Sequence, residues 1–133
     1  MFTYNTQIFL HHTDAAGRLF FANQFYLIYE AKEKFFDAMG LVIIDMLNHP
    51  VLTFPLVHAE SDYKAMLAAG DKISISVGIE KLGATSVTFA YTIMKGDVLA
   101  GTAKTVSVCV DKKTQTKCPL PAEWRQKFQA HLI

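Results

Sequence analysis

In the central part of this chain, the spacing of apolar residues changes from the period of a helix to the period of a strand. Early in the chain, apolar residues recur every three or four positions at Phe25, Ile28, Ala31, Phe35 and Met39. This spacing predicts a helix of about 16 residues, with Asn23 as its N-cap and Gly40 as its stop. From Leu56 onward, apolar and small polar residues alternate, which is typical of half-buried strands.

Turn residues divide the alternating region into strands. One face of the first segment carries Ile73, Ile75, Val77 and Ile79, and one face of the next carries Val87, Phe89, Tyr91 and Ile93. Turn signals stand at Gly70-Asp71, Leu82-Gly83 and Lys95-Gly96-Asp97. The remaining elements expected are a first strand over 2–10, a loop around Pro50 and Pro55, a long strand over 98–110 and a short helix over 123–130. We therefore expect one α+β domain over residues 1–133, with an antiparallel sheet wrapped around one long central helix.

Composition excludes several classes of protein. The chain is 51% hydrophobic and 19% charged, which indicates a packed globular protein. A formal net charge of +1 provides no field that would attract nucleic acid or an anionic membrane. No apolar run approaches the length of a membrane span, and the N-terminal residues lack the pattern of an export signal. Cys109 and Cys118 match neither a zinc site nor a secreted disulfide scaffold, so we expect a cytoplasmic protein without a metal.

The loop before the predicted helix contains one acid, Asp14, among small residues. The start of a helix presents unpaired N–H groups and the positive end of the helix dipole. A carboxylate on the preceding loop can therefore reach a substrate that docks there. Asp14 can serve as a nucleophile, as a general base, or only as a capping residue, and the sequence leaves these alternatives open.

The histidines and Glu60 are weaker indications of a functional site than Asp14 is. His11 and His12 are adjacent, so on an extended strand they would point to opposite sides, and no acid or cysteine cluster completes a metal site. His58 shares a strand face with Leu56 and Glu60 by the period of two, and it either lines a pocket or is a satisfied core histidine. Glu60 is most simply a solvated or paired acid.

Two motifs resemble the 4-hydroxybenzoyl-CoA thioesterase family of the hot-dog fold. The first is the loop Thr13-Asp14-Ala15-Ala16-Gly17, followed by Phe20-Phe21, Phe25-Tyr26 and Glu30-Ala31. The second runs from Pro55 to Tyr63 and is closed by Gly70-Asp71. The string Pro55-Leu56-Val57-His58-Ala59 resembles the branch that hydrolyses 1,4-dihydroxy-2-naphthoyl-CoA, a step toward phylloquinone or menaquinone. The chain departs from the family at His12, where the first acid of the loop is usual, and near Met66, where a proline is usual.

The resemblance implies an enzyme, an acyl-CoA thioesterase, and a role for each motif residue. Asp14 would carry the reaction, the backbone N–H of Phe21 would bind the oxyanion, and Gly17 would allow the close turn between them. Side chains that would line the acyl site are Phe20, Phe25, His58 and Glu60, and Arg18, Lys64 and Lys81 are candidates for the CoA phosphates. CoA would be part of the substrate, so no cofactor is expected.

The resemblance also implies a homodimer or homotetramer in which His58 and Glu60 face the Asp14 loop of another subunit. Two alternatives of the same fold are a general short- or medium-chain acyl-CoA thioesterase and a non-catalytic acyl-CoA-binding module. A hot-dog dehydratase fits less well, because the acid here precedes the helix. No nucleic acid or membrane partner is expected.

Overall fold

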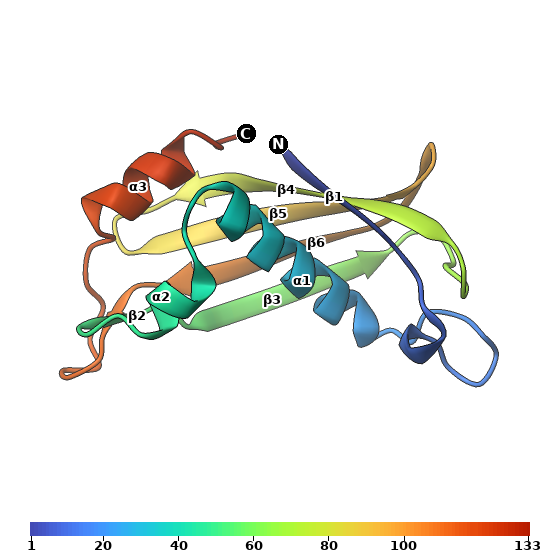
Figure 1. Ribbon diagram of the computed structural model, residues 1–133, viewed down its shortest axis with the longest axis horizontal. Coiled ribbons are helices and arrows are strands. Elements are labelled where there is room, and N and C mark those ends of the chain that lie inside the picture. Colours follow the sequence, from blue (N-terminus) through green and yellow to red (C-terminus); the bar gives the residue numbers. More distant parts are fainter.

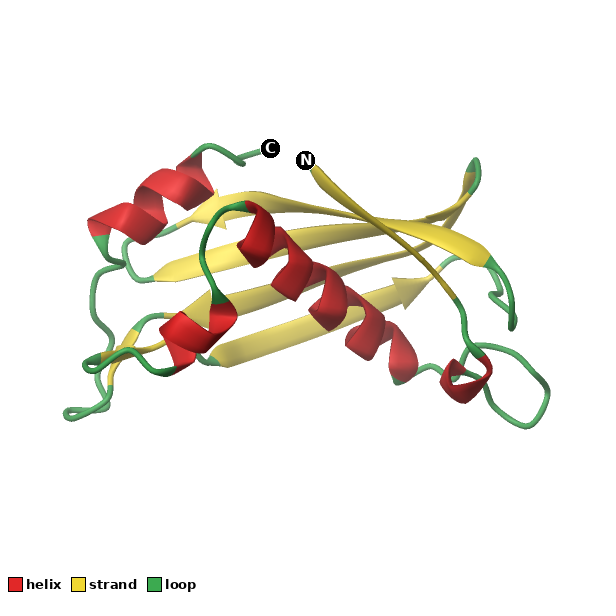
Figure 2. Ribbon diagram, in the orientation of Figure 1, coloured by secondary structure: helices red, strands yellow, loops and turns green.

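A five-stranded antiparallel sheet crossed by one long helix forms the body of the molecule in this computed structural model, which describes residues 1–133 (Figures 1 and 2). The order across the sheet is β1-β4-β5-β6-β3. The strands are β1 (Phe2–Gln7), β3 (Leu56–Tyr63), β4 (Lys72–Leu82), β5 (Ser86–Lys95) and β6 (Val98–Val108). The α+β class and the antiparallel sheet are thus confirmed. β3 lies at one edge and pairs only with β6, so its other side is open.

The predicted helix is present as α1 (Asn23–Ala38), and Gly40 follows its end with a φ of +75°. The N-cap, however, is Ala22, and Asn23 is already helical. The Asn23 side chain is engaged elsewhere, because its Nδ2 donates to the carbonyl of His12 at 2.8 Å. The predicted C-terminal helix is α3 (Ala122–Gln129), and no helix is long and apolar enough to cross a membrane.

Two of the predicted strands end earlier than expected. The first stops at Gln7, and a single 3₁₀ turn, η1 (Leu10–His12), follows it. The long strand stops at Val108, because the Cys109 N–H leaves the ladder and donates to the carbonyl of Thr85. Short elements that the pattern did not reveal are α2 (Ile43–Leu47), β2 (Leu52–Thr53) and β7 (Val110–Asp111), the last two paired with each other.

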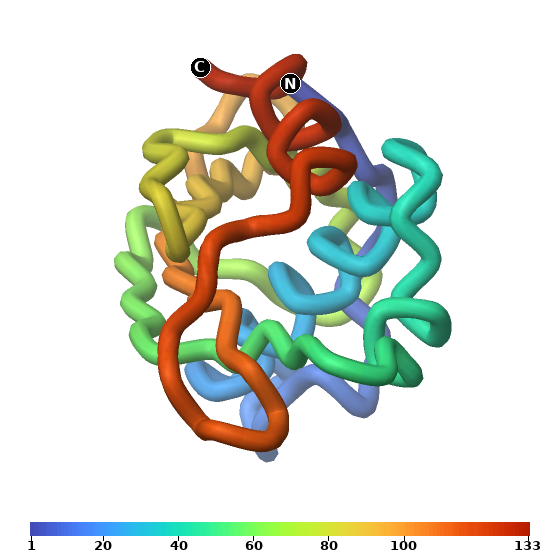
Figure 3. The backbone as a smooth tube through the Cα atoms, turned by 90° about the vertical axis from the view of Figure 1, so that its left-hand side faces the viewer, coloured from blue at the N-terminus to red at the C-terminus, as the bar shows by residue number.

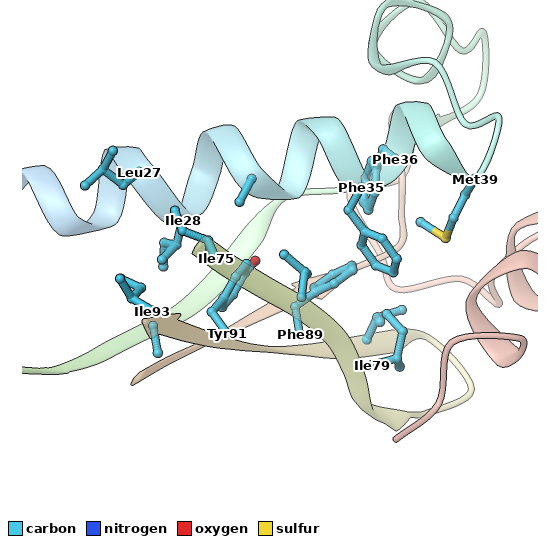
Figure 4. Close-up of a cluster of buried hydrophobic side chains, with 14 of the residues drawn as sticks. Leu27, Ile28, Phe35, Phe36, Met39, Ile75, Ile79, Phe89, Tyr91 and Ile93 are labelled. Atoms are coloured by element: carbon cyan, nitrogen blue, oxygen red, sulfur yellow. The ribbon is translucent and has the colours of Figure 1, made fainter. Parts of the chain in front are cut away.

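The core lies between α1 and one face of the sheet (Figure 4). Helix α1 contributes Leu27, Ile28, Ala31, Phe35 and Phe36, and the strands contribute Ile75, Ile79, Phe89, Tyr91 and Ile93. Tyr91 keeps its hydroxyl in this core because Thr105 Oγ1 lies 2.8 Å away. The opposite face of the sheet is polar, with Thr3 beside Ser76 and a Lys104–Glu80 ion pair of 2.9 Å. The chain termini lie side by side next to β4 (Figures 1 and 3).

One charged residue, Lys32, is buried in this core with only 7% of its surface exposed. Burial lowers its pKa from 10.5 to about 8, because desolvation disfavours the ammonium. Lys32→Met is therefore expected to raise the free energy of unfolding at pH 7 by about 1–2 kcal/mol, since it removes a buried charge at similar volume.

The pH dependence of this difference has a definite sign. Below pH 8 both the folded and the unfolded chain carry the Lys32 proton, so the full desolvation cost applies. As the pH rises from about 8 to 10.5, the folded chain releases the proton first and the cost fades. Urea unfolding of the wild type and of Lys32→Met at several pH values should show that their difference in free energy of unfolding becomes smaller over that interval. A difference that is constant with pH would contradict this account of Lys32.

Candidate active site

The Asp14 loop is a tight turn held by its own acid. The Asp14 N–H donates to the carbonyl of Arg18 at 2.8 Å, and the Gly17 N–H donates to the carbonyl of Asp14 at 3.0 Å. Gly17 has a φ of +74°, a left-handed conformation that glycine adopts without strain. Asp14 Oδ1 accepts the N–H groups of Ala16 at 2.9 Å and Arg18 at 3.2 Å. One carboxylate oxygen thus fixes the loop, and Oδ2 has no hydrogen bond within the chain.

The start of α1 presents free donors. The N–H groups of Phe21 and Ala22 make no hydrogen bond within the chain, as is usual for the first residues of a helix. The Phe21 carbonyl is held in place, because it accepts the Tyr63 hydroxyl at 2.5 Å. This contact ties the end of β3 to the start of α1. Because the Phe21 N–H makes no hydrogen bond within the chain, it is available to an oxyanion, as the predicted role requires.

A cavity of about 350 Å³ opens beside Asp14, between the loop and the end of β3. Its walls include Asp14, Arg18, Gln24, Tyr63, Lys64 and Met66. The structure thus brings two of the three candidate phosphate-binding cations, Arg18 and Lys64, to the mouth of the Asp14 site. The third, Lys81, lies on β4 outside this cavity.

Gln24 and Tyr63 are site residues that the sequence reasoning missed. Gln24 is only 1% exposed, and its Nε2 donates to Ser61 Oγ at 2.7 Å and to the Asp62 carbonyl at 3.1 Å. The available sequence signal for Gln24 was its polar side chain at the second position of a helix that packs on the core. Both residues join the start of α1 to β3, so they fix the wall of the cavity.

His58 and Glu60 lie away from the Asp14 loop of their own chain. They form a pair of 2.9 Å with about half of each side chain exposed, so His58 is not a core histidine. They pair in register with Val106 and Lys104, on the polar face of the sheet. The expectation that Leu56 shares their face is wrong, because the register shifts between Leu56 and His58. This bulge turns Leu56 toward α1, where it lines two cavities.

The aromatic residues around the loop do not enclose it within one chain. Phe20 and Phe21 are 44% and 64% exposed, and their rings lie 4.8 Å apart. Phe25 is half-buried and lines a separate small cavity between α1 and β3, with Tyr26 and Ala59. The single chain therefore places the acid and the free N–H groups near the helix start but leaves their surroundings open.

His11 and His12 follow the first strand and do not lie on it. They belong to the 3₁₀ turn, and their ring centroids lie 4.1 Å apart. The chain contains no group of three or more metal-ligating side chains around them or elsewhere.

His12, which stands where the resemblance implied an acid, acts as a hydrogen-bond acceptor. Its Nδ1 accepts the Phe9 N–H at 2.9 Å, and its carbonyl accepts the Phe20 N–H at 3.0 Å. Burial, followed by the neighbouring His11, lowers the pKa of His12. A neutral imidazole thus supports the turn that precedes Asp14.

Acidification is expected to weaken this turn. Because the folded chain holds His12 neutral, the unfolded chain takes up the proton first, and stability falls as the pH drops below about 6.5. His12→Asn keeps an acceptor that does not titrate, so its melting temperature should fall less than that of the wild type between pH 7 and pH 5. Equal losses in the two proteins would show that His12 does not contribute to the acid sensitivity.

Comparison with known proteins identifies the family of this chain. Residues 9–128 match the model of the thioesterase-like superfamily. A 1,4-dihydroxy-2-naphthoyl-CoA hydrolase from Nostoc punctiforme is 34% identical over 122 residues, which cover 92% of this chain and 82% of that protein. The crystal structure of a 1,4-dihydroxy-2-naphthoyl-CoA thioesterase from Synechocystis superposes with a TM-score of 0.91 at 28% identity, covering 96% of this chain and 95% of that one.

A gentisyl-coenzyme A thioesterase of known structure is also similar, with a TM-score of 0.85 at 25% identity, over 95% of this chain and 98% of that one. The matched region contains the Asp14 loop, α1 and every strand from β3 onward. Together with its fold, these matches establish that the chain belongs to the thioesterase-like superfamily.

Proposed function

We propose that this protein hydrolyses the thioester of 1,4-dihydroxy-2-naphthoyl-CoA, a step toward phylloquinone or menaquinone. The observation that carries the proposal is the pairing of a loop carboxylate, Asp14, with free N–H groups at the start of α1. The similar proteins from Nostoc punctiforme and Synechocystis, which are named for this reaction, support the choice of acyl group. In this proposal the hot-dog sheet wraps around α1 as its central helix, and the site forms at the start of that helix.

The chemistry needs an attacking oxygen and a site for the developing negative charge. In one route, Asp14 Oδ2 takes a proton from water as the water oxygen bonds to the thioester carbon. In the other, Oδ2 itself attacks and water then hydrolyses the mixed anhydride. In both routes the Phe21 N–H binds the oxyanion, the C–S bond breaks, and the products are CoA and the free acid. The reaction requires no cofactor or metal.

The CoA portion would bind at the mouth of the Asp14 cavity. Arg18 and Lys64 line this cavity, and both carry the positive charge that phosphate groups require. The Arg18 Nη1 lies 3.0 Å from Met66 Sδ, so its side chain extends along the cavity wall. Arg18 and Lys64 are thus the proposed phosphate ligands.

The active unit would be a homodimer or homotetramer in the cytoplasm. The open edge of β3 has unpaired backbone groups, and apolar side chains beside it are exposed. They are Tyr26, Tyr29, Leu56, Val57 and Tyr63, with exposed fractions between 45% and 71%. Antiparallel pairing of two β3 edges would cover them and bring His58 and Glu60 toward the partner's Asp14 loop.

A panel of CoA thioesters tests the acyl specificity. The rate of thiol release is measured for 1,4-dihydroxy-2-naphthoyl-CoA, 4-hydroxybenzoyl-CoA, hexanoyl-CoA and dodecanoyl-CoA. We expect the highest kcat/KM for the bicyclic aromatic substrate. A higher value for the aliphatic thioesters would instead identify a general acyl-CoA thioesterase.

A further inference from the structure

A second cavity, of about 380 Å³, lies against the C-terminal half of α1 and contains the buried Lys32. Its walls come from α1, from α2 and from the segment Thr53–Leu56 that leads into β3; in Figure 3 the turquoise α2 lies beside α1. It shares no lining residue with the Asp14 cavity. Lys32 follows Gln24 by eight positions, which is about 12 Å along a helix. The two cavities are therefore separate sites.

The Lys32 ammonium has fewer acceptors than donors. Nζ donates to Ser107 Oγ at 3.0 Å, and no carboxylate lies within ion-pair distance. An ammonium has three N–H donors, so two find no acceptor within the chain. Burying a charge without an anionic partner is costly, and a ligand that supplies acceptor oxygens would offset that cost.

Four aromatic rings lie close to the Lys32 ammonium, and three of them line the cavity. The ammonium lies 4.4 Å from the ring centre of Phe89 and between 5.7 and 5.9 Å from those of Phe36, Tyr29 and Phe54. The last three rings also line the cavity, as do the apolar side chains of Ile43, Met46 and Leu56. The cavity thus combines apolar walls with one cationic group, and its size falls within the range of about 300–1,000 Å³ that is usual for small-molecule sites.

We propose that this cavity binds an apolar carboxylate, with its hydrocarbon body between α1 and α2 and its two oxygens on the Lys32 ammonium. The carboxylate supplies the acceptors that the ammonium lacks, and the rings cover the apolar body. The acid released by the proposed hydrolysis belongs to this chemical class, and so does a free fatty acid. The inference goes beyond the proposed function, because it requires nothing of Asp14.

The affinity of the cavity for a carboxylate should depend on whether Lys32 is protonated. Burial lowers the pKa of Lys32 to about 8, so affinity for a carboxylate should weaken as the pH rises above that value. The other ionisable groups that line the cavity are Glu33 and the Tyr29 hydroxyl, both on α1. The lining residues of α2 and of the Thr53–Leu56 segment do not ionise, and β6 contributes the neutral Ser107.

Calorimetric titration of the full chain at pH 7 tests the proposal with 2-naphthoate, dodecanoate and the neutral analogue 2-naphthamide. We expect one carboxylate to bind at least tenfold more tightly than the amide. Preference for naphthoate would point to an aromatic product acid as the occupant, and preference for dodecanoate to a fatty acid.

Three variants locate the binding site. Lys32→Met should remove the preference for the carboxylate, whereas Lys34→Met, which changes an exposed lysine of the same helix, should leave it unchanged. Met46→Trp keeps Lys32 but fills the cavity from α2, so it should abolish binding of the carboxylate and the amide alike. Unchanged affinity in both Lys32→Met and Met46→Trp would overturn the proposal. So would loss of carboxylate binding in Arg18→Met alone, because the acid would then occupy the Asp14 cavity.

Discussion

Asp14→Asn is expected to lower kcat for thioester hydrolysis by at least about 10²-fold and to leave the fold intact. Oδ1 of the asparagine can still accept the N–H groups of Ala16 and Arg18, so the loop should keep its shape. The change removes the charge and basicity of the other carboxylate oxygen. Steady-state thiol release with the best substrate of the panel, together with the melting temperature, checks both parts of the expectation.

Phe21→Leu is the matched control for this result. It alters an exposed ring but keeps the backbone N–H that would bind the oxyanion. Turnover should therefore stay within about tenfold of the wild type, since loss of such a donor costs about 10²–10³-fold. The assignment of Asp14 would be wrong if Asp14→Asn folded normally and turned over substrate as fast as Phe21→Leu.

Dilution of the protein to nanomolar concentration is expected to reduce its specific activity and its stability together. In the proposed dimer, the β3 edge and the cleft depend on the same interface, so dissociation exposes Val57 and Tyr29 and opens the site. Light scattering and activity measured over the same dilution series provide the comparison. A monomer with full specific activity would exclude a shared site.

Val57→Lys shifts this equilibrium without touching the Asp14 cavity. Val57 lies at the bulge in β3 and is 59% exposed, and two like charges across a two-fold axis should weaken the dimer by at least about tenfold. Val98→Lys makes the same change at a valine that is 53% exposed at the start of β6, away from the β3 edge. Val57→Lys should lose activity at a protein concentration at least about tenfold higher than the wild type does, whereas Val98→Lys should follow the wild type. Equal behaviour of the two would place the interface elsewhere or show that none exists.

The strong periodicities of the sequence predicted the fold well. Phe25 to Met39 identified α1, and the alternation of Ile73 to Ile79 and of Val87 to Ile93 identified β4 and β5, because each set of side chains must face one core. Errors arose where a side-chain hydrogen bond or a β-bulge overrode the pattern. Asn23 donates to His12 instead of capping the helix, and the bulge at Val57 moves Leu56 to the other face of β3.

The candidate site was predictable in part. The motif around Asp14 and Gly17 located the acid and the turn, since both depend on residues close in sequence. The contacts of Gln24 with Ser61 and of Tyr63 with Phe21 join segments about 40 residues apart, so no local pattern reveals them. Lys32 stands four residues from both Ile28 and Phe36, so the helical spacing places it on the apolar face of α1, and the structure shows that it is buried there without an anionic partner.

The most direct test of the proposed hydrolysis measures two quantities for the wild-type protein and 1,4-dihydroxy-2-naphthoyl-CoA. One is the release of the CoA thiol, and the other is the binding of the intact thioester. We expect the rate to be proportional to the amount of enzyme and to saturate with substrate, with one free acid formed for each CoA released. Tight binding of a thioester that stays intact would contradict the proposed hydrolysis and would identify the chain as a non-catalytic acyl-CoA-binding module.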